Sequence, residues 1–291
     1  MLLAPTGAGK TIMLSSLIGK RHSSNKNVLV LQHRDELVNQ NMDKFKRINP
    51  NISTSIVNAQ EKNWKGDAVF SMVQTLCRPN NLQDMKSIDM VVVDESHHIV
   101  ADSYLRIINY AKEANKDVKI VGFTATPNRG DKKGLREVFT NCSHQIEIST
   151  LIREGFLVTP KTYVIDVGVR SELQNVRKTA IDFDMAQVAS IMNKRAINER
   201  VVDEWIVTGE TARNVRASIL DDLTNGDVQV VVNVAVLTEG FDAPPVSCII
   251  LTRPCSYKAT MVQMIGRGLR TIDPDEHPNI IKTDCIVLDF G

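Results

Sequence analysis

Small residues followed by lysine and threonine stand near the start of the chain, in an order typical of phosphate binding. Residues 4–11 read Ala-Pro-Thr-Gly-Ala-Gly-Lys-Thr, which matches G-x-x-x-x-G-K-[ST] except that Ala4 replaces the first glycine. Lys10 would reach the β- and γ-phosphates of a nucleotide, and the Thr11 hydroxyl would hold Mg²⁺. A chance glycine-rich turn is the alternative explanation. The loop backbone would bind the phosphates through Thr6, Gly7, Ala8 and Gly9.

Two adjacent carboxylates follow the apolar residues 90–93. Asp94 would hold the Mg²⁺ shell, directly or through water, and Glu95 would orient and deprotonate the attacking water of in-line phosphoryl transfer. A helix-capping Asp followed by a solvated Glu is the alternative. The apolar run before the pair and the phosphate loop upstream favour the catalytic interpretation. His97 and His98 lack the spacing of a zinc site, so we expect no metal there.

One glutamine and two arginines near the end of the chain form a third candidate group. Arg267 and Arg270 are three residues apart, so on a helix they would share a face, beside Gln263. Together they would clamp a γ-phosphate, because arginine from a second domain can stabilise the charge of phosphoryl transfer. Taken alone, the pattern is more typical of a solvated basic helix end.

Short apolar runs in the first half predict the scaffold that positions these groups. We expect a strand before the phosphate loop and an amphipathic helix at residues 12–18 after it. Further strands are expected at residues 28–31, 68–73, 90–93 and 119–123. Helical patterns lie between them, which predicts a parallel sheet with ligands at the carboxyl ends of its strands. Polar clusters follow these runs, at the places where that rule puts a site.

The second half repeats this alternation but has no phosphate loop of its own. Strands are expected at residues 161–167, 228–236, 248–251 and 285–288, and helices at 186–207, 212–223 and 257–265. The fold class is therefore α/β. We expect two domains, residues 1–158 and 159–291, with 149–160 as their connection.

Composition limits the class of protein further. The chain has 35 basic and 34 acidic residues, which excludes a basic tail and still permits a local basic groove. Its five cysteines include no C-x-x-C pair, which indicates buried free thiols in a reducing compartment. No apolar run approaches the roughly 18 residues of a membrane helix, and the phosphate loop stands where a signal peptide would begin. We therefore expect a cytoplasmic protein.

Five motifs together resemble the superfamily 2 helicases. In order they are residues 4–11, Asp-Glu-Ser-His at 94–97, Thr-Ala-Thr at 124–126, Thr-Glu-Gly-Phe-Asp at 238–242 and Gln-x-x-Gly-Arg-x-x-Arg at 263–270. The order and approximate spacing are those of the family. The resemblance is greatest to the DEAD/DEAH-type group, which includes bacterial and phage DNA helicases and the motor subunits of restriction enzymes.

The resemblance implies two RecA-like parallel-sheet domains, with ATP and Mg²⁺ as cofactors. It implies catalytic roles for Lys10, Asp94, Glu95, Gln263, Arg267 and Arg270. Residues that would couple hydrolysis to domain movement are His97, Thr124, Thr126, Gly240 and Asp242. Nucleic-acid contacts would be Gln32, His33, Arg34, Gln74, Thr75 and Thr238. These contacts would go to the phosphate backbone, so little sequence preference is expected.

The function implied is an ATP-dependent helicase or translocase that acts on nucleic acid, with DNA favoured over RNA. One alternative is a catalytically impaired remnant that binds ATP or nucleic acid. Another is the motor subunit of a restriction system, working with restriction or repair partner subunits. No nuclease-like cluster of carboxylates and lysine stands out in the chain itself.

Three departures from the family pattern predict an incomplete second domain. The chain starts at the phosphate loop, without the preceding segment that reads adenine, and it stops where relatives continue. Between residues 207 and 208, relatives carry a further βαβ unit of about 30 residues. We therefore expect a second sheet that is incomplete and has exposed edges.

Overall fold

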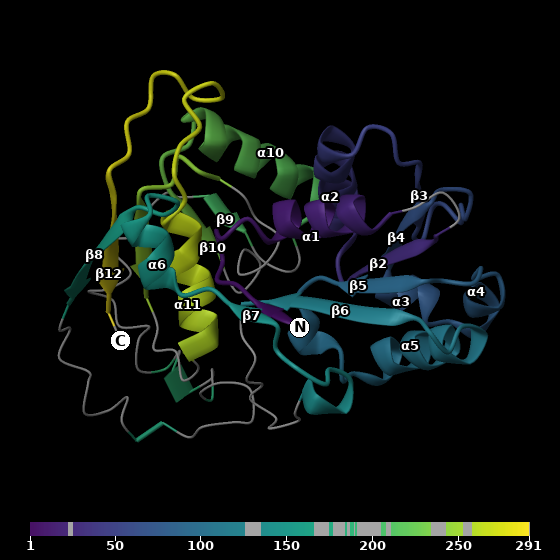
Figure 1. Cartoon of the computed structure of the whole chain (residues 1–291). Coiled ribbons are helices and arrows are strands. Elements are labelled where there is room, and N and C mark those ends of the chain that lie inside the picture. The colour runs from purple at the N-terminus through teal and green to yellow at the C-terminus, as the bar shows by residue number, and fades with distance from the viewer. Residues whose placement is uncertain are drawn as a thin grey trace. The chain divides into compact units, whose positions relative to one another are not determined.

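The computed structural model of the chain describes residues 1–22, 26–125, 135–165, 175–176, 184, 187–188, 190, 205–207, 211–233, 243–252 and 258–290. The chain divides into two compact units, Met1–Glu147 and Ile148–Gly291 (Figure 1). This division comes before the boundary that we expected after residue 158. Residues 157 and 158 explain the difference: the Val158 N–H donates to the Leu269 carbonyl at 2.8 Å, and Leu157 forms a β-bridge with Arg270.

A parallel sheet of seven strands, counted over the described residues, forms the first unit. Its order is β3-β4-β2-β5-β6-β1-β7. The bounds are Leu2–Leu3 for β1, Val28–Gln32 for β2, Thr54–Val57 for β3, Ala68–Met72 for β4, Met90–Val93 for β5, Lys119–Thr124 for β6 and His144–Gln145 for β7. The predicted strands of this half are all present. Thr54–Val57 and His144–Gln145 were not singled out from the sequence.

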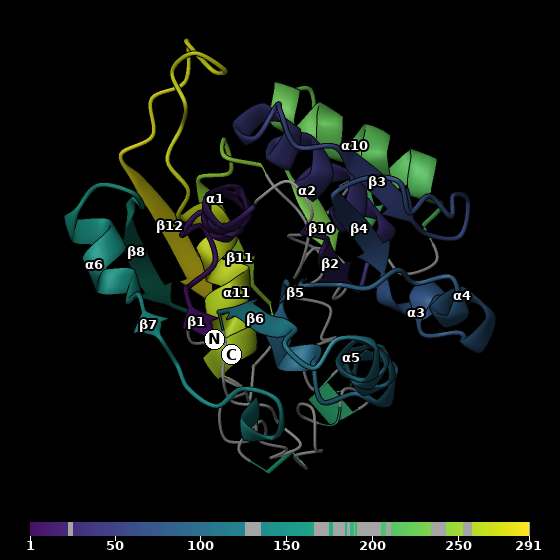
Figure 2. The same cartoon turned by 45° about the vertical axis from the view of Figure 1, so that its right-hand side comes forward.

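Helices cover both faces of this sheet, as an apolar parallel sheet requires. Alternate residues of β2 point to opposite faces, so Val30 packs with α1 (Lys10–Arg21) and α2 (Asp35–Ile48), while Leu31 packs on the side of α5 (Asp102–Ala114). Figure 2 shows α1 and α2 on one side of the strands and α5 on the other. The shorter helices are α3 (Val73–Leu76), α4 (Pro79–Gln83) and the 3-10 turns η1 (Ser96–His98) and η2 (Leu135–Glu137).

Strand register brings the ends of the central strands to one edge. Leu31 is level with Val93, Val93 with Gly122, and Leu3 with Thr124. The residues that follow these positions therefore meet at the carboxyl edge of the sheet, as the sequence predicts.

Parallel strands also form the second unit. Strands β8 (Thr159–Val164), β11 (Cys248–Leu251) and β12 (Asp284–Asp289) pair in the order β11-β12-β8, and β9 (Trp205–Val207) pairs with β10 (Val231–Asn233). Its helices are α6 (Ile148–Arg153), α10 (Arg213–Asn225) and α11 (Lys258–Gly268). Residues 208–210 and 234–242 lie outside the described residues, so the expected incompleteness of this sheet stays a prediction.

Two expectations from the sequence are wrong. Residues 205–207 form a strand rather than the end of a helix, because Ile206 pairs with Val232 in a neighbouring strand. The cysteines are not uniformly buried: among the four in the described residues, only Cys285 is buried, while Cys142 and Cys248 are exposed. Cys255 lies outside the described residues.

Candidate active site

The phosphate-loop residues connect β1 to α1 in the conformation that their glycines favour. Gly7 and Gly9 have φ angles of 84° and 73°, which residues with a Cβ adopt at a cost. Gly9 directly precedes α1, and no side chain caps this helix end among the described residues. The first N–H groups of α1 are therefore available to an anion. The Ala4 N–H donates to the Thr124 carbonyl at 2.9 Å, which joins the loop to β6.

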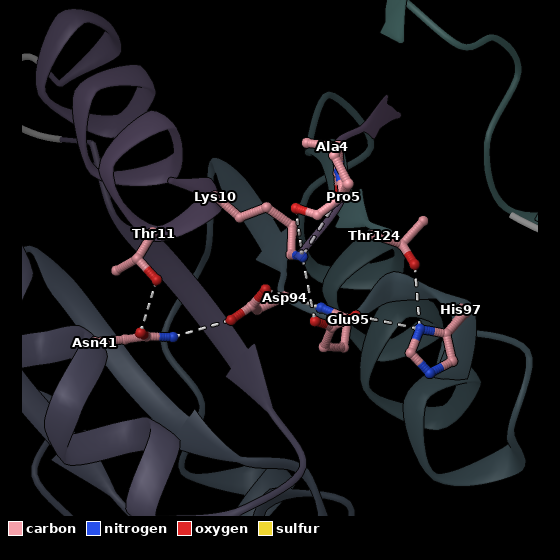
Figure 3. Close-up of polar contacts among 9 residues, drawn as sticks. All are labelled: Ala4, Pro5, Lys10, Thr11, Asn41, Asp94, Glu95, His97 and Thr124. Carbon is pink, nitrogen blue, oxygen red and sulfur yellow. Dashed lines mark hydrogen bonds and ion pairs between the residues drawn. The ribbon is translucent and has the colours of Figure 1, made fainter. Parts of the chain in front are cut away.

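Lys10 lies between the loop and the acidic pair (Figure 3). Its Nζ is 3.4 Å from the Ala4 carbonyl oxygen, 3.5 Å from that of Pro5 and 3.5 Å from Glu95 Oε1. The ammonium group therefore interacts with two carbonyl oxygens of the loop and neutralises the charge of the neighbouring Glu95 carboxylate. From this position it can interact with phosphates bound to the loop.

Asp94 follows β5 and is almost fully buried. Its Oδ1 accepts a hydrogen bond from the Glu95 N–H at 3.0 Å, and its Oδ2 accepts one from Asn41 Nδ2 at 3.0 Å. Burial, and then the Glu95 carboxylate, raise the pKa of Asp94. The Asn41 Oδ1 in turn accepts a hydrogen bond from the Thr11 hydroxyl at 3.0 Å. The two residues expected to hold Mg²⁺ are thus joined through one amide.

Glu95 is the only residue other than glycine with a positive φ in the described part of the chain, at 47°. This left-handed conformation costs a residue with a Cβ about 1–2 kcal/mol. It places the carboxylate between two partners, with Oε1 3.5 Å from Lys10 Nζ and Oε2 3.4 Å from His97 Nδ1. The predicted base therefore has a strained backbone, and its carboxylate is held between Lys10 and His97.

His97 connects the acidic pair to β6. Its Nδ1 lies 3.1 Å from Thr124 Oγ1, and its ring contacts that of His98 in a tilted arrangement, with 4.0 Å between centroids and 43° between the ring planes. The His98 ring is in turn 4.8 Å from that of His33. This chain of contacts joins two predicted coupling residues to one of the predicted nucleic-acid residues.

The other predicted nucleic-acid residues of the first unit differ in exposure. Gln32 is fully buried at the end of β2, Arg34 is half-buried, Gln74 is exposed and Thr75 is buried on α3. Thr75 lines a surface cavity of about 480 Å³ together with Ala59, Lys62, Arg78, Pro79, Asn80 and Asn81. No sequence motif contains Lys62 or Arg78, two basic residues that line this cavity together with Thr75.

The predicted clamp of the second unit is not a single helix face. Gln263 is buried and Arg267 half-buried on α11, but the helix ends at Gly268. Arg270 lies beyond it, in the bridge with Leu157, and burial lowers its pKa to about 10. The expected shared helix is therefore wrong for Arg270. Predicted site residues that lie outside the described residues are Thr126, Thr238, Gly240 and Asp242.

The donor set of the first unit fits Mg²⁺ and a nucleotide phosphate. A threonine hydroxyl and a carboxylate supply the oxygen ligands that Mg²⁺ prefers, and a nearby cation would favour the ionised form of buried Asp94. The described residues hold no cluster of three or more His, Cys, Asp or Glu that could bind a metal ion by themselves. No helix within the described ranges is long and apolar enough to cross a membrane.

Family models match both units. The model of the type III restriction enzyme res subunit matches residues 1–129, and that of the helicase conserved C-terminal domain matches residues 173–271. IRC3 of Saccharomyces cerevisiae, named an ATP-dependent helicase, is 30% identical over 95% of this chain and 47% of its own length. The irc3 protein of Schizosaccharomyces pombe is 27% identical over 98% of this chain and 52% of its own. The chain thus spans about half the length of these relatives.

One of these alignments also shows how many positions of a relative have no counterpart in this chain. The alignment with the Saccharomyces cerevisiae protein is 324 positions long and covers 95% of the 291 residues of this chain, so about 48 positions have no counterpart here. That number exceeds the roughly 30 residues of the βαβ unit expected to be missing.

Solved structures share the fold at low sequence identity. A fragment of a Vibrio vulnificus protein named as the HsdR subunit of a type I restriction enzyme has a TM-score of 0.66 at 18% identity, over 99% of this chain and 59% of that one. Saccharomyces cerevisiae Dbp5 bound to RNA and ADP BeF3 has a TM-score of 0.65 at 15% identity, over 100% and 79%. The chain therefore shares the RecA-like fold of these structures. Helicase-related family models thus match both units, and the chain resembles the superfamily 2 helicases, among them the motor subunits of restriction enzymes.

Proposed function

We propose that this chain is an ATP-dependent motor that couples phosphoryl transfer to movement along nucleic acid, with DNA favoured over RNA. The observation that carries the proposal is the meeting of Lys10, Thr11, Asp94 and Glu95 at one edge of the first sheet. Lys10 is 3.5 Å from Glu95, and one amide joins Thr11 to Asp94. This set contains a phosphate ligand, two oxygen ligands for a cation and a base.

Each residue has a separate task in the proposed reaction. The loop N–H groups and Lys10 would bind the phosphates, while Thr11 and Asp94 would hold Mg²⁺. Bound Mg²⁺ would neutralise charge that develops on the phosphate oxygens. Glu95 orients the attacking water and accepts its proton, and His97 keeps the carboxylate in position. The roles of Gln263, Arg267 and Arg270 at the γ-phosphate stay a proposal for the second unit.

The cavity beside Thr75 supports a nucleic-acid contact in the first unit. Lys62 and Arg78 are exposed at its rim, and Asn80 and Asn81 offer amide groups. Cations and amides suit the sugar-phosphate backbone, which carries no sequence information. We propose that a strand lies against this cavity.

Names of relatives support the preference for DNA. MPH1 of Pyricularia oryzae is named an ATP-dependent DNA helicase. It is 27% identical to this chain over 52% of this chain and 15% of its own length. The match of residues 1–129 to a restriction-enzyme subunit supports the second candidate function, a motor subunit that works with a nuclease or methylase partner. Cytoplasmic location stays a prediction, and the Schizosaccharomyces pombe relative is named mitochondrial.

Steady-state ATP hydrolysis tests the proposal, measured with and without single- and double-stranded DNA and RNA. We expect stimulation by one nucleic acid, DNA before RNA. The Glu95→Gln variant should lose at least about a hundredfold in turnover, because general-base catalysis contributes that much. Turnover no higher than that of Glu95→Gln would contradict the motor, and would leave an impaired binding protein.

A further inference from the structure

The geometry points to Asn41 as a positioning residue for the Mg²⁺–nucleotide complex, a role that rests on the proposed function. None of the five helicase motifs contains Asn41. Asn41 lies on α2 and is 2% exposed. Its neighbours on the same face, Val38, Met42 and Phe45, pack against the sheet in an apolar cluster. A polar side chain at such a position requires hydrogen-bond partners.

Both partners of Asn41 belong to the predicted cation site. The Thr11 hydroxyl donates to Asn41 Oδ1 at 3.0 Å, and Asn41 Nδ2 donates to Asp94 Oδ2 at 3.0 Å (Figure 3). Thr11 lies in the first turn of α1 and Asp94 follows β5, so the amide links two elements that are far apart in sequence.

The carboxylate decides which way the amide points. As a ligand of Mg²⁺, Asp94 would be ionised and could only accept hydrogen bonds, which agrees with the NH₂ group of Asn41 facing it. The amide oxygen is then left to face Thr11. This orientation obliges the Thr11 hydroxyl to donate its single proton to Asn41, and the hydroxyl lone pairs point elsewhere.

Asn41 therefore orients both oxygen ligands of the cation, the Thr11 hydroxyl and the Asp94 carboxylate. Thr11 keeps its lone pairs for the cation, because its proton is already committed to the amide. The Asp94 carboxylate is fixed in rotation by Asn41 on one oxygen and by the Glu95 N–H on the other. Groups that orient the ligands of a metal in this way set its affinity.

Binding of a fluorescent ADP analogue, measured once with Mg²⁺ and once with EDTA, tests this role without requiring turnover. The informative variant is Asn41→Leu, which has a similar size and no hydrogen bonds. Its matched control is Asn39→Leu, the same change at an exposed position of the same helix. Asn41→Ala is a second variant in case leucine disturbs the fold, because water can solvate Asp94 in the space that alanine leaves.

We expect the Mg²⁺-dependent gain in affinity to fall about tenfold in Asn41→Leu and Asn41→Ala, as for other residues that orient metal ligands. Affinity in EDTA and the behaviour of Asn39→Leu should match the wild type. A fall of equal size with Mg²⁺ and with EDTA would show a structural role and overturn the inference. An unchanged gain would also overturn it and leave the proposed function standing, whereas wild-type protein that binds no nucleotide would contradict the function itself.

Discussion

Lys10 and Glu95 form an ion pair across the candidate site, with Lys10 Nζ 3.5 Å from Glu95 Oε1 and side-chain exposures of 11% and 13%. The pair joins the phosphate loop to the predicted base while little water reaches either group. Each charge thus compensates the other, and phosphate oxygens that bind Lys10 must compete with Glu95 for it.

Removal of one partner of this pair should destabilise the protein more than removal of both. We expect Lys10→Met to lower the free energy of unfolding by about 1–2 kcal/mol, because it leaves the Glu95 carboxylate partly buried without its cation. The double variant Lys10→Met/Glu95→Gln should recover part of this loss. Urea unfolding of the two single variants and the double variant measures the coupling. Strictly additive losses would show that the pair contributes nothing.

The left-handed conformation of Glu95 predicts an unusual order of stabilities at this position. Glu95→Gly and Glu95→Ala both remove the carboxylate, but only alanine retains a Cβ at a φ of 47°. We expect the glycine variant to be more stable than the alanine variant by about 1 kcal/mol, and both to be inactive. Urea unfolding decides the matter. The reverse order, as in a helix interior, would mean that residue 95 leaves this conformation in solution.

Charge removal beside Thr75 should weaken nucleic-acid binding and leave basal ATP hydrolysis unchanged. We expect Lys62→Gln and Arg78→Gln each to reduce the slope of log affinity against log salt by about 1, as for the loss of one phosphate contact. Fluorescence anisotropy of a labelled oligonucleotide over a range of salt concentrations measures this slope. Lys116→Gln is the control, because Lys116 is exposed just before β6, at the opposite edge of the sheet. An equal effect of Lys116→Gln would assign the slope to overall charge.

Lys282 should make the stability of the second unit depend on pH. Burial lowers the pKa of Lys282 to about 8, and its Nζ donates to the Pro244 carbonyl. In the unfolded chain the pKa is about 10.4. Between these values the unfolded chain binds more protons, so stability rises with pH. Burial raises the pKa of Cys285 to about 11, which opposes this trend above about pH 8, where the thiol of the unfolded chain begins to ionise.

Between pH 8 and pH 9 the two groups, Lys282 and Cys285, act in opposite directions, so the comparison of the wild type with Lys282→Met assigns the contribution of Lys282. We expect a rise of somewhat less than about 1 kcal/mol across this pH range, since the ammonium is partly exposed and screened, and no such rise in Lys282→Met. The chain has two tryptophans, Trp64 in the first unit and Trp205 in the second. Fluorescence-detected urea unfolding in a Trp64→Phe background reports the second unit alone. An identical pH slope in Lys282→Met would contradict the pKa shift.

Local sequence patterns predict most of the first unit because its central strands β2, β4 and β5 are buried on both faces. The apolar run at 28–31 leaves few alternatives to a central strand, and the strand ends then place Asp94 and Thr124. The same patterns predicted that residues 205–207 are helical, because strand pairing with residues 231–233 is not visible in local periodicity. Local patterns do not identify Asn41 for a related reason, because its hydrogen-bond partners are 30 and 53 residues away in the sequence.

The hydrogen bond from the Ala4 N–H to the Thr124 carbonyl attaches the phosphate loop directly to the end of β6. The Thr124 hydroxyl contacts His97 Nδ1, while the Thr124 carbonyl accepts the hydrogen bond from the loop. A force applied to the loop therefore has a short path to the chain that follows residue 124, without passing through the helices. A nucleotide bound at the loop would then act directly on the end of β6, through the main-chain hydrogen bond of Ala4 and the pairing of β1 with β6.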